Sequence, residues 1–223
     1  MTKSKGINRR DVTRNIGMAA GAAIFGSSIV SAAVPTPAQI EGPFHPGWDQ
    51  DDLDLDLTRI DGHSDVASGE MMLVRGRVTD TGGNPLRNAL VDIWQANEHG
   101  KYAHPDDPSP EPLDPNFQGQ GVINTDAEGS YAFRTIRPGA YPLKYLGFDG
   151  WRAAHIHFQV SHEHSDTLTT QMYFEGDPLL QQDEELAKVP EELHQLLIPK
   201  PVIDDGSGLP LLRFDLVLTM TDV

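Results

Sequence analysis

The stretch from Trp151 to Phe158, with the residues that follow it, constrains the fold more than any other part of this chain. Polar and apolar side chains alternate along it, with His155, His157 and Gln159 interleaved with Ile156, Phe158 and Val160. Because a β-strand has a side-chain period of two, both imidazoles are expected on one face and the apolar residues in a core. Two histidines on one strand face form half of a metal site. The metal and its other ligands are open at this point.

The composition indicates one β-rich domain without thiol chemistry. The chain has 223 residues, of which 38% are hydrophobic, enough for one sizeable core. The 21 glycines and 17 prolines, together with short apolar runs, are typical of strands joined by many turns. Since there is no cysteine, disulfides, iron–sulfur clusters and thiol nucleophiles are excluded, and a metal must be held by His, carboxylate, Tyr or backbone oxygen.

The hydrophobic pattern predicts an all-β fold. Strands are expected over residues 71–79, 89–95, 122–125, 130–135, 154–161, 170–174 and 211–219. Only residues 182–197 show leucines at helical spacing, and Pro190 interrupts them. Strands separated by turns, without alternating helices, predict an antiparallel β-sandwich with long loops and one short helix. Residues 106–120 form a long Pro- and Gly-containing loop of the kind that usually has a function.

The N-terminal region is expected to contain two segments that are not part of the sandwich. Arg9 and Arg10 precede a mildly apolar, Ala- and Gly-rich stretch, which predicts a twin-arginine export signal over residues 1–33 and a periplasmic or extracellular location. The alternative, a membrane anchor, is less favoured because the stretch is weakly hydrophobic. Residues 34–70 are rich in Pro and Asp and predict an extended N-terminal arm, followed by the sandwich domain over residues 71–223.

The charge excludes one class of partner. The formal net charge is −16, and the export signal holds five of the 17 basic residues and one of the 33 acidic residues, so the remainder would carry −20. So acidic a protein repels phosphate backbones, and a nucleic-acid partner is not expected.

Two tyrosines complete the pattern around the histidines. Alone, Tyr102 and Tyr141 would be interpreted as surface or half-buried aromatic residues. They occur, however, within a series of motifs that comprises Val91–Asn97, Gly100–Tyr102, Pro112–Phe117, Gly129–Tyr131, Pro138–Pro142, Trp151–Phe158, Gln171–Asp177 and Arg213–Asp215. With these motifs the sequence resembles the intradiol ring-cleaving dioxygenases, and within them the protocatechuate 3,4-dioxygenase branch, from about Thr36 to Leu218.

The resemblance implies a non-haem Fe(III) bound by Tyr102, Tyr141, His155 and His157, with a solvent hydroxide as fifth ligand. Two tyrosinates and one hydroxide balance the charge of Fe(III), which gives a neutral core that can be buried. Hard phenolate oxygens also favour Fe(III) over Fe(II). The implied reaction is cleavage of a catechol with O2 between the two hydroxylated carbons, giving a cis,cis-muconate-type diacid.

The resemblance also implies catalytic roles for three residues. Tyr141 is the ligand that the catechol displaces, and Gln171 matches a position that hydrogen-bonds near the carbon that reacts with oxygen. Arg152 would stabilise negative charge on the ring by its fixed positive charge. The alternative for Arg152 is a surface salt bridge with Asp149.

The arm offers an expectation about assembly. Residues 36–39 and 42–44 resemble the arm of the family's partner subunit that lines the pocket, so one chain carrying both features suggests a homo-oligomer or a self-contained pocket. Two other functions stay open: an exported β-sandwich binding module without catalysis, and a hydrolase with zinc on His155 and His157.

Overall fold

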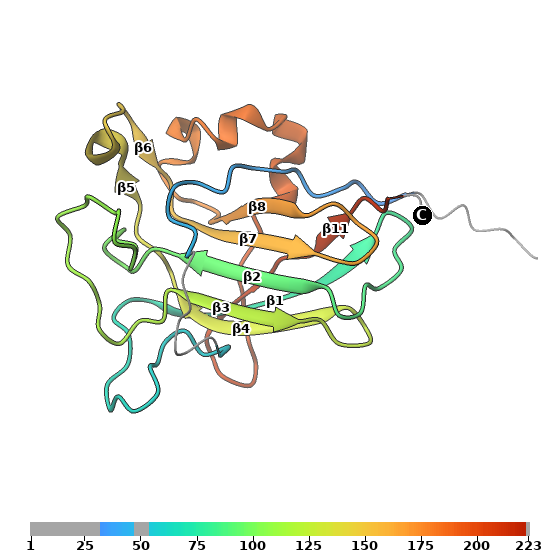
Figure 1. Cartoon of the computed structure of the whole chain (residues 1–223), viewed down its shortest axis with the longest axis horizontal. Coiled ribbons are helices and arrows are strands. Elements are labelled where there is room, and N and C mark those ends of the chain that lie inside the picture. The colour runs from blue at the N-terminus through green and yellow to red at the C-terminus, as the bar shows by residue number, and fades with distance from the viewer. Residues whose placement is uncertain (1–31, 47–53, 222–223) are drawn as a thin grey trace, which may run out of the picture. The chain divides into compact units, whose positions relative to one another are not determined.

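The strands pack in two layers. The computed structural model describes residues 32–46 and 54–221, all within one unit. One sheet has the order β3 (Gln120–Asn124), β2 (Leu90–Gln95), β7 (His155–Ser161) and β8 (Leu168–Tyr173), and all its pairs are antiparallel. The other sheet is built on β1 (Met71–Asp80), which pairs with β4 (Ser130–Ile136), β10 (Pro210–Arg213) and β11 (Leu216–Leu218), while β9 (Val202–Ile203) pairs with β10. Figure 1 shows β2, β3 and β7 in front of β1.

The predicted β-sandwich is confirmed, with two differences in its second sheet. β1 is antiparallel to β4 but parallel to β10 and β11. The strand expected over residues 211–219 is divided, because Phe214 N donates to the carbonyl of Arg75 and Asp215 accepts from Arg77 N. Gly76 permits this approach, since a Cβ there would lie 1.8 Å from the Phe214 carbonyl oxygen.

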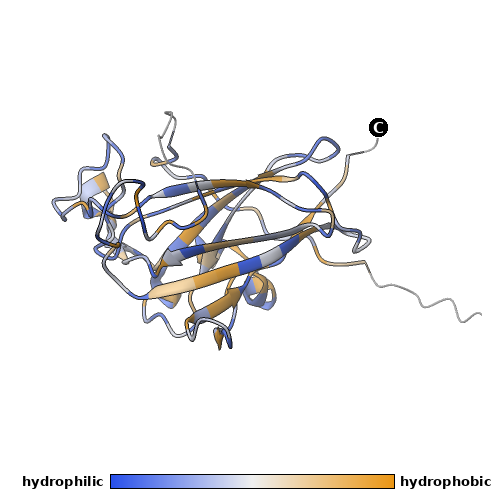
Figure 2. Ribbon diagram, turned by 90° about the horizontal axis from the view of Figure 1, so that it is seen from below, coloured by the Kyte–Doolittle hydropathy of each residue, from blue (hydrophilic) through white to orange (hydrophobic). Residues whose placement is uncertain are grey.

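The core lies between the two sheets. Ile156, Phe158 and Val160 of β7 pack there with residues of the opposite sheet such as Val74 and Phe133, and all five are buried. Figure 2 shows hydrophobic residues concentrated on the strands and hydrophilic residues on many of the connecting loops. The alternation predicted for this strand is therefore observed, and burying its apolar face directs the histidines to the other face.

The segment predicted as one helix forms short 3-10 turns instead. These are η2 (Leu180–Gln182), η3 (Leu186–Lys188) and η4 (Glu191–Leu196), and the described residues contain no α-helix. Pro190 has no N–H for a helical hydrogen bond and directly precedes η4. Asp183 also interrupts the segment, because its side chain accepts hydrogen bonds from the backbone amides of Glu185 and Leu186.

Residues 32–46 form no helix or strand but follow the sandwich closely. Thr36 N donates to the carbonyl of Val217, Gln39 N to that of Thr169, and Thr170 Oγ1 to that of Pro37. In Figure 1 this segment, drawn in blue, runs along β8. The predicted export signal lies outside the described residues, except for residues 32 and 33. Within the described ranges no helix has the length and apolarity needed to cross a membrane.

A small third sheet lies beside the sandwich. It pairs β5 (Tyr141–Pro142) with β6 (Trp151–Arg152), and the 3-10 helix η1 (Leu143–Leu146) follows β5. In Figure 1 this hairpin lies near the end of the front sheet where β7 begins and β2 ends.

Candidate active site

The two histidines are held by the sheet register. His155 and His157 lie at the start of β7, on the face opposite the core, and both are buried. Trp94 is paired with His157 across β2 and β7, and its ring stacks on the imidazole with a centroid distance of 4.7 Å and an interplanar angle of 5°. Neighbouring strands therefore fix both the position and the orientation of the rings.

Three donor atoms converge on one point. Tyr102 Oη lies 3.3 Å from His155 Nε2 and 3.2 Å from His157 Nε2, and the two nitrogens are 3.1 Å apart. Three atoms at these separations can all lie about 2.1 Å from a common centre, which is the usual length of a metal–imidazole bond. The geometry is therefore that of three adjacent ligands.

The loops that carry the two tyrosines pack closely because of two glycines. Gly100 has a φ of 74°, and a Cβ there would lie 2.6 Å from the carbonyl oxygen of Ala140. A Cβ at Gly139 would lie 2.4 Å from the carbonyl oxygen of Glu98. Only a residue without a side chain permits this contact, so both glycines bring Tyr102 and Tyr141 together.

Asn97 organises the first of these loops. Its backbone carbonyl accepts hydrogen bonds from Gly100 N and Gly139 N, so it joins the two loops. Its side-chain oxygen accepts from the amides of His99 and Lys101, and its side-chain amide donates to the carbonyl of Pro112. This set of hydrogen bonds holds the backbone that leads into Tyr102.

Tyr141 lies against two of the other predicted ligands. Its ring centroid is 5.9 Å from that of Tyr102 and 5.8 Å from that of His155. The β5–β6 pairing places Tyr141 directly opposite Arg152. The four residues predicted as ligands are thus brought together, with Arg152 next to them.

The protonation states suit a metal that binds phenolate and neutral imidazole. His155 Nδ1 lies 2.7 Å from the carbonyl oxygen of Ala153, so Nδ1 carries the proton and Nε2 has a free lone pair. Burial lowers the pKa of both imidazoles well below the usual value, so both are neutral. Burial raises the pKa of Tyr102 and Tyr141, and a bound trivalent cation would oppose that by favouring the phenolate.

The donor set fits Fe(III) better than the metals of the alternative functions. Two hard phenolate oxygens and two imidazoles form the set, and such oxygens favour a trivalent ion. In residues 32–46 and 54–221 there is no group of three or more His, Asp or Glu that could hold a metal. A zinc hydrolase site built on His155 and His157 would therefore lack a third ligand of the usual kind.

Arg152 is buried and paired, but not with Asp149. Its Nε donates to Asp183 Oδ2 at 2.9 Å, and the same carboxylate oxygen accepts from Ala153 N. The surface salt bridge considered from the sequence is therefore wrong: the partner is a fully buried carboxylate 31 positions along the chain. Burial alone would lower the pKa of Arg152, but Tyr141 and Asp183 outweigh it and raise that pKa, so the side chain stays charged.

Gln171 and Tyr173 complete the surroundings of Arg152. On β8 they lie opposite His157 and His155, respectively. Gln171 Oε1 accepts from Arg152 Nη2 and lies 3.0 Å from the Tyr173 hydroxyl oxygen, and Gln171 Nε2 donates to the carbonyl of Ile40 at 2.8 Å. Both polar ends of the Gln171 side chain are thus engaged by protein groups, and Gln171 is fully buried.

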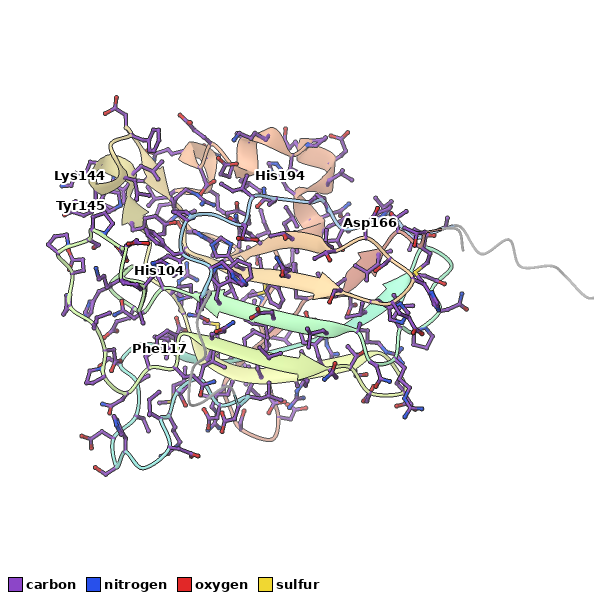
Figure 3. The ribbon with its side chains drawn as sticks, in the orientation of Figure 1. His104, Phe117, Lys144, Tyr145, Asp166 and His194 are labelled. Carbon is purple, nitrogen blue, oxygen red and sulfur yellow. The ribbon has the colours of Figure 1, made fainter. Side chains whose placement is uncertain are left out.

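A cavity of about 530 Å³ opens beside this cluster. Tyr141 and Arg152 form part of its wall, and Ile40, Gly42 and Pro43 of the N-terminal segment form another part. Arg152 Nη1 makes no hydrogen bond with any described residue, so it is the nitrogen free to meet a ligand. Figure 3 shows Lys144 and Tyr145 of η1 at this end of the molecule and Asp166, in the β7–β8 turn, at the opposite end.

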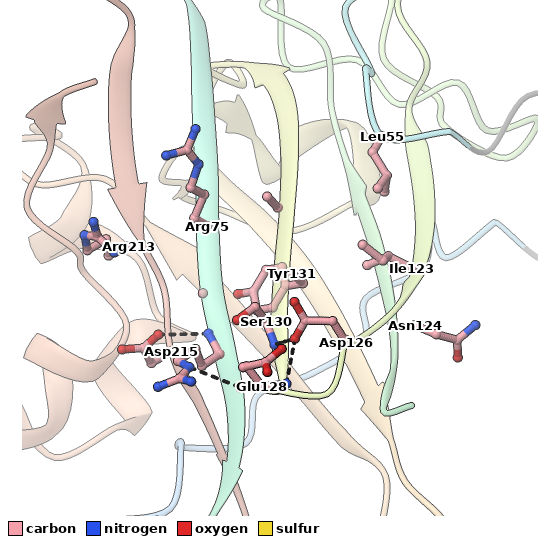
Figure 4. Close-up of a pocket in the computed structure, with 13 residues that line it drawn as sticks. Leu55, Arg75, Ile123, Asn124, Asp126, Glu128, Ser130, Tyr131, Arg213 and Asp215 are labelled. Atoms are coloured by element: carbon pink, nitrogen blue, oxygen red, sulfur yellow. Dashed lines mark hydrogen bonds between the residues drawn. The ribbon is translucent and has the colours of Figure 1, made fainter. Parts of the chain in front are cut away.

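A second hollow, of about 760 Å³, contains none of the predicted site residues. It lies along β1, β3 and β4, where Figure 4 shows Arg75, Tyr131 and Ile123 around it. Arg75 pairs with Asp204, and the Tyr131 hydroxyl donates to the carbonyl of Phe214, so these groups have partners within the protein.

Sequence reasoning missed three residues of the site. Trp94 stacks on His157, Asp183 pairs with Arg152, and Tyr173 contacts both Arg152 and Gln171. The alternation along β2 and β8 could have placed Trp94 and Tyr173 on the histidine face. No periodic signal marks Asp183, because it lies in an irregular segment.

Comparisons with known proteins agree with this geometry. A family model described as "Dioxygenase" matches residues 40–220. The protocatechuate 3,4-dioxygenase beta chain of Burkholderia cepacia is 42% identical over 196 residues, which cover 85% of this chain and 83% of that one. The chain belongs to the intradiol ring-cleavage dioxygenases. It is an oxidoreductase of that family, and the resemblance found in the sequence is confirmed.

Other proteins are similar to this dioxygenase in sequence or in fold. Catechol 1,2-dioxygenase 1 of Acinetobacter lwoffii is 35% identical over 203 residues, which cover 82% of this chain and 61% of that enzyme. The crystal structure of 3-chlorocatechol 1,2-dioxygenase from Rhodococcus opacus 1CP matches with a TM-score of 0.64 and 28% identity, covering 83% of this chain and 73% of that one.

Proposed function

We propose that this dioxygenase depends on Fe(III) and cleaves a catechol with O2 between its two hydroxylated carbons, giving a cis,cis-muconate-type diacid. The observation that carries the proposal is the convergence of Tyr102 Oη, His155 Nε2 and His157 Nε2 within 3.3 Å of one another, with Tyr141 against them. Tyr102, Tyr141, His155 and His157 would hold the ion. When bound, Fe(III) makes the ring of a coordinated catechol reactive toward O2.

Tyr141 has a proton-accepting role in this proposal. It is the predicted ligand that lies in the cavity wall, whereas Tyr102, His155 and His157 do not line the cavity. If the ion holds Tyr141 as phenolate, its oxygen could take up one of the two protons that a catechol loses on binding, and the solvent hydroxide implied by the resemblance could take up the other. The same position makes Tyr141 the ligand that an entering substrate meets.

Arg152 stabilises negative charge on the substrate ring. Its guanidinium lines the cavity with Nη1 unpaired, and Asp183, Gln171 and Tyr173 fix its other nitrogens. A fixed charge of this kind costs no reorganisation during the reaction. Gln171 acts as a positioning residue for Arg152 instead of contacting the reacting carbon, because its own polar atoms are engaged.

Colour and metal content test the function. Iron-loaded protein should absorb visible light through charge transfer from tyrosinate to Fe(III), and its hue should change when catechol is added without oxygen. Oxygen uptake should then follow, with the ring-opened diacid as product. A colourless protein that holds stoichiometric zinc and does not consume oxygen would contradict the proposal.

The role of Arg152 needs a variant that does not leave Asp183 as an unpaired buried charge, which would itself be destabilising. The double variant Arg152→Leu/Asp183→Asn removes both charges. Its visible absorption and anaerobic catechol binding should survive, while kcat falls about 100-fold or more. Asp183→Asn alone is the control that keeps the charge of Arg152. It leaves that guanidinium without its buried partner, so the free energy of unfolding should fall as well, and kcat should fall less than in the double variant. Equal rates for the double variant and the wild type would show that Arg152 has no catalytic role.

The predicted localisation is a separate proposal supported by the sequence alone. We propose export through the pair Arg9-Arg10 and the uncharged stretch from Ile16 to Ala38. Replacing both arginines by lysine should retain the protein in the cytoplasm on cell fractionation. The homo-oligomer expected from the arm also stays a prediction, which analytical ultracentrifugation can test. The N-terminal segment of the same chain lines the cavity, as a self-contained pocket requires.

A further inference from the structure

The cavity is larger than a bare catechol needs. Its volume is about 530 Å³, whereas a void of about 150 Å³ accommodates a benzene ring. A catechol placed against Tyr141 and Arg152 therefore leaves space toward the mouth for a substituent on the ring.

The wall around that space is apolar. Ile40, Leu143, Leu146 and Phe148 line it, and Ile40 and Phe148 are 45% and 66% exposed. Covering such surface with an apolar group releases water and favours binding. The walls themselves provide a reason for an apolar substituent to bind.

The charges at the mouth that have no ion-pair partner among the described residues are acidic. Asp149, Glu184 and Glu185 line the cavity, and among the described residues Arg152 is its only basic lining residue. The charge of Arg152 is balanced by the buried Asp183. Glu185 is bonded to Lys188, but Asp149 and Glu184 make no ion pair with any described residue. With a formal charge of −16 on the whole chain, the entrance repels anions.

We propose that this site selects uncharged catechols with an apolar ring substituent and discriminates against catechols with a ring carboxylate. The inference rests on the proposed function, since it concerns the substrate of the same site. It differs from what the relationship to a protocatechuate enzyme alone would suggest, because protocatechuate carries a ring carboxylate.

A matched pair of substrates isolates the effect of charge. Protocatechuate and its methyl ester carry substituents of similar size at the same ring position, but only the acid is ionised at neutral pH. Because the ester group also withdraws electron density from the ring, the salt dependence of the rate ratio identifies the part that is due to charge. At low ionic strength the kcat/KM of iron-loaded enzyme should be roughly tenfold or more higher for the ester, and the ratio should shrink in high salt. A ratio of one or below would overturn the proposal, while cleavage of either substrate would still support the dioxygenase function.

Variants connect this ratio to the named side chains. Asp149→Asn/Glu184→Gln should reduce the ester-to-acid ratio several-fold. The control Glu163→Gln/Asp166→Asn removes the same two charges in the β7–β8 turn, where Figure 3 shows Asp166 at the other end of the molecule, and should leave the ratio unchanged. If the two double variants reduced the ester-to-acid ratio equally, the selectivity would come from the net charge of the protein and not from the residues at the mouth. That result would overturn the proposal.

The apolar wall has its own test. Phe148→Ala should reduce the preference for 4-tert-butylcatechol over catechol several-fold. Val202→Ala is the control, because Val202 is similarly exposed but lies on β9 and does not line the cavity. An unchanged preference in Phe148→Ala would contradict this part of the proposal.

Binding without turnover separates the inference from the function. In equilibrium dialysis with metal-free protein, the methyl ester should bind more tightly than the acid, and Asp149→Asn/Glu184→Gln should narrow the difference. If the protein binds the ester selectively but cleaves no catechol when loaded with iron, the proposed function fails and the inference stands. If the iron-loaded protein cleaves the ester and the acid with equal efficiency, the inference fails and the proposed function stands.

Discussion

The two halves of the ligand set are held in different ways. His155 and His157 lie within β7, whose register with β2 and β8 is fixed by many ladder hydrogen bonds and by a buried apolar face. Tyr102 and Tyr141 lie on irregular or very short segments, which are joined by Asn97 and by the close approach at Gly100 and Gly139. The sandwich supplies a rigid pair of donors, and loop packing adds the pair that provides negative charge.

The largest effect is expected from removing a donor of the rigid half. His155→Ala deletes a ligand without disturbing the core face of β7, so iron affinity should fall more than about 100-fold, beyond the loss typical of an outer-shell partner. Iron content and visible absorption measure this. Gln159→Ala is the control, because Gln159 shares the strand face but bonds to Glu41 and Thr169. Retention of iron by His155→Ala would exclude His155 as a ligand.

A smaller effect is expected from separating the loops of the second half. At Gly139→Ala the new Cβ would lie 2.4 Å from the Glu98 carbonyl oxygen, so the loops must move apart. The free energy of unfolding should fall by about 1–3 kcal/mol, and iron affinity by about tenfold. Denaturant titration measures the free energy of unfolding, and iron titration measures the affinity. Gly206→Ala is the control, because the nearest atom to its new Cβ is 3.4 Å away. It should change neither the free energy of unfolding nor the iron affinity. Unaltered iron affinity in Gly139→Ala would show that loop packing does not hold the tyrosines.

The smallest effect is expected from the residue that supports the rigid half through stacking. Trp94→Phe keeps an aromatic face toward His157 and removes Nε1, which is buried and has no hydrogen-bond partner among the described residues. The loss of volume should cost about 1–2 kcal/mol of stability, partly offset by removal of the unpaired donor. Iron affinity should fall only a few-fold. Thermal unfolding without iron measures the loss of stability, and the shift of Tm on adding iron measures the change in iron affinity. A loss as large as that of His155→Ala would mean that the ring of Trp94, and not the strand register, positions His157.

The same contrast explains what the sequence could predict. The alternation along residues 155–160 predicted the β7 strand and the common face of its histidines, because a period of two has one structural meaning. The tyrosines follow no period, and their assignment depended on resemblance to a family. Leucine spacing over residues 182–197 predicted a helix, but Pro190 and the side chain of Asp183 favour short turns there. The Arg152–Asp183 pair joins distant positions, and sequence spacing alone gives no sign of it.

The contacts of the N-terminal segment have a consequence for the proposed export. Ile40, Gly42 and Pro43 line the cavity, the Ile40 carbonyl holds Gln171, and Gln39 accepts from the Tyr173 hydroxyl. Thr36 N donates a hydrogen bond to the carbonyl of Val217, and Thr36 Oγ1 accepts one from Val217 N. Val217 lies near the C-terminal end of the sequence. If the proposed export signal is cleaved, the cleavage must occur before these residues. A cut a few residues too late would remove part of the cavity wall and leave the sandwich folded. Under the export proposal, the exact site of cleavage would then decide whether the exported protein is active.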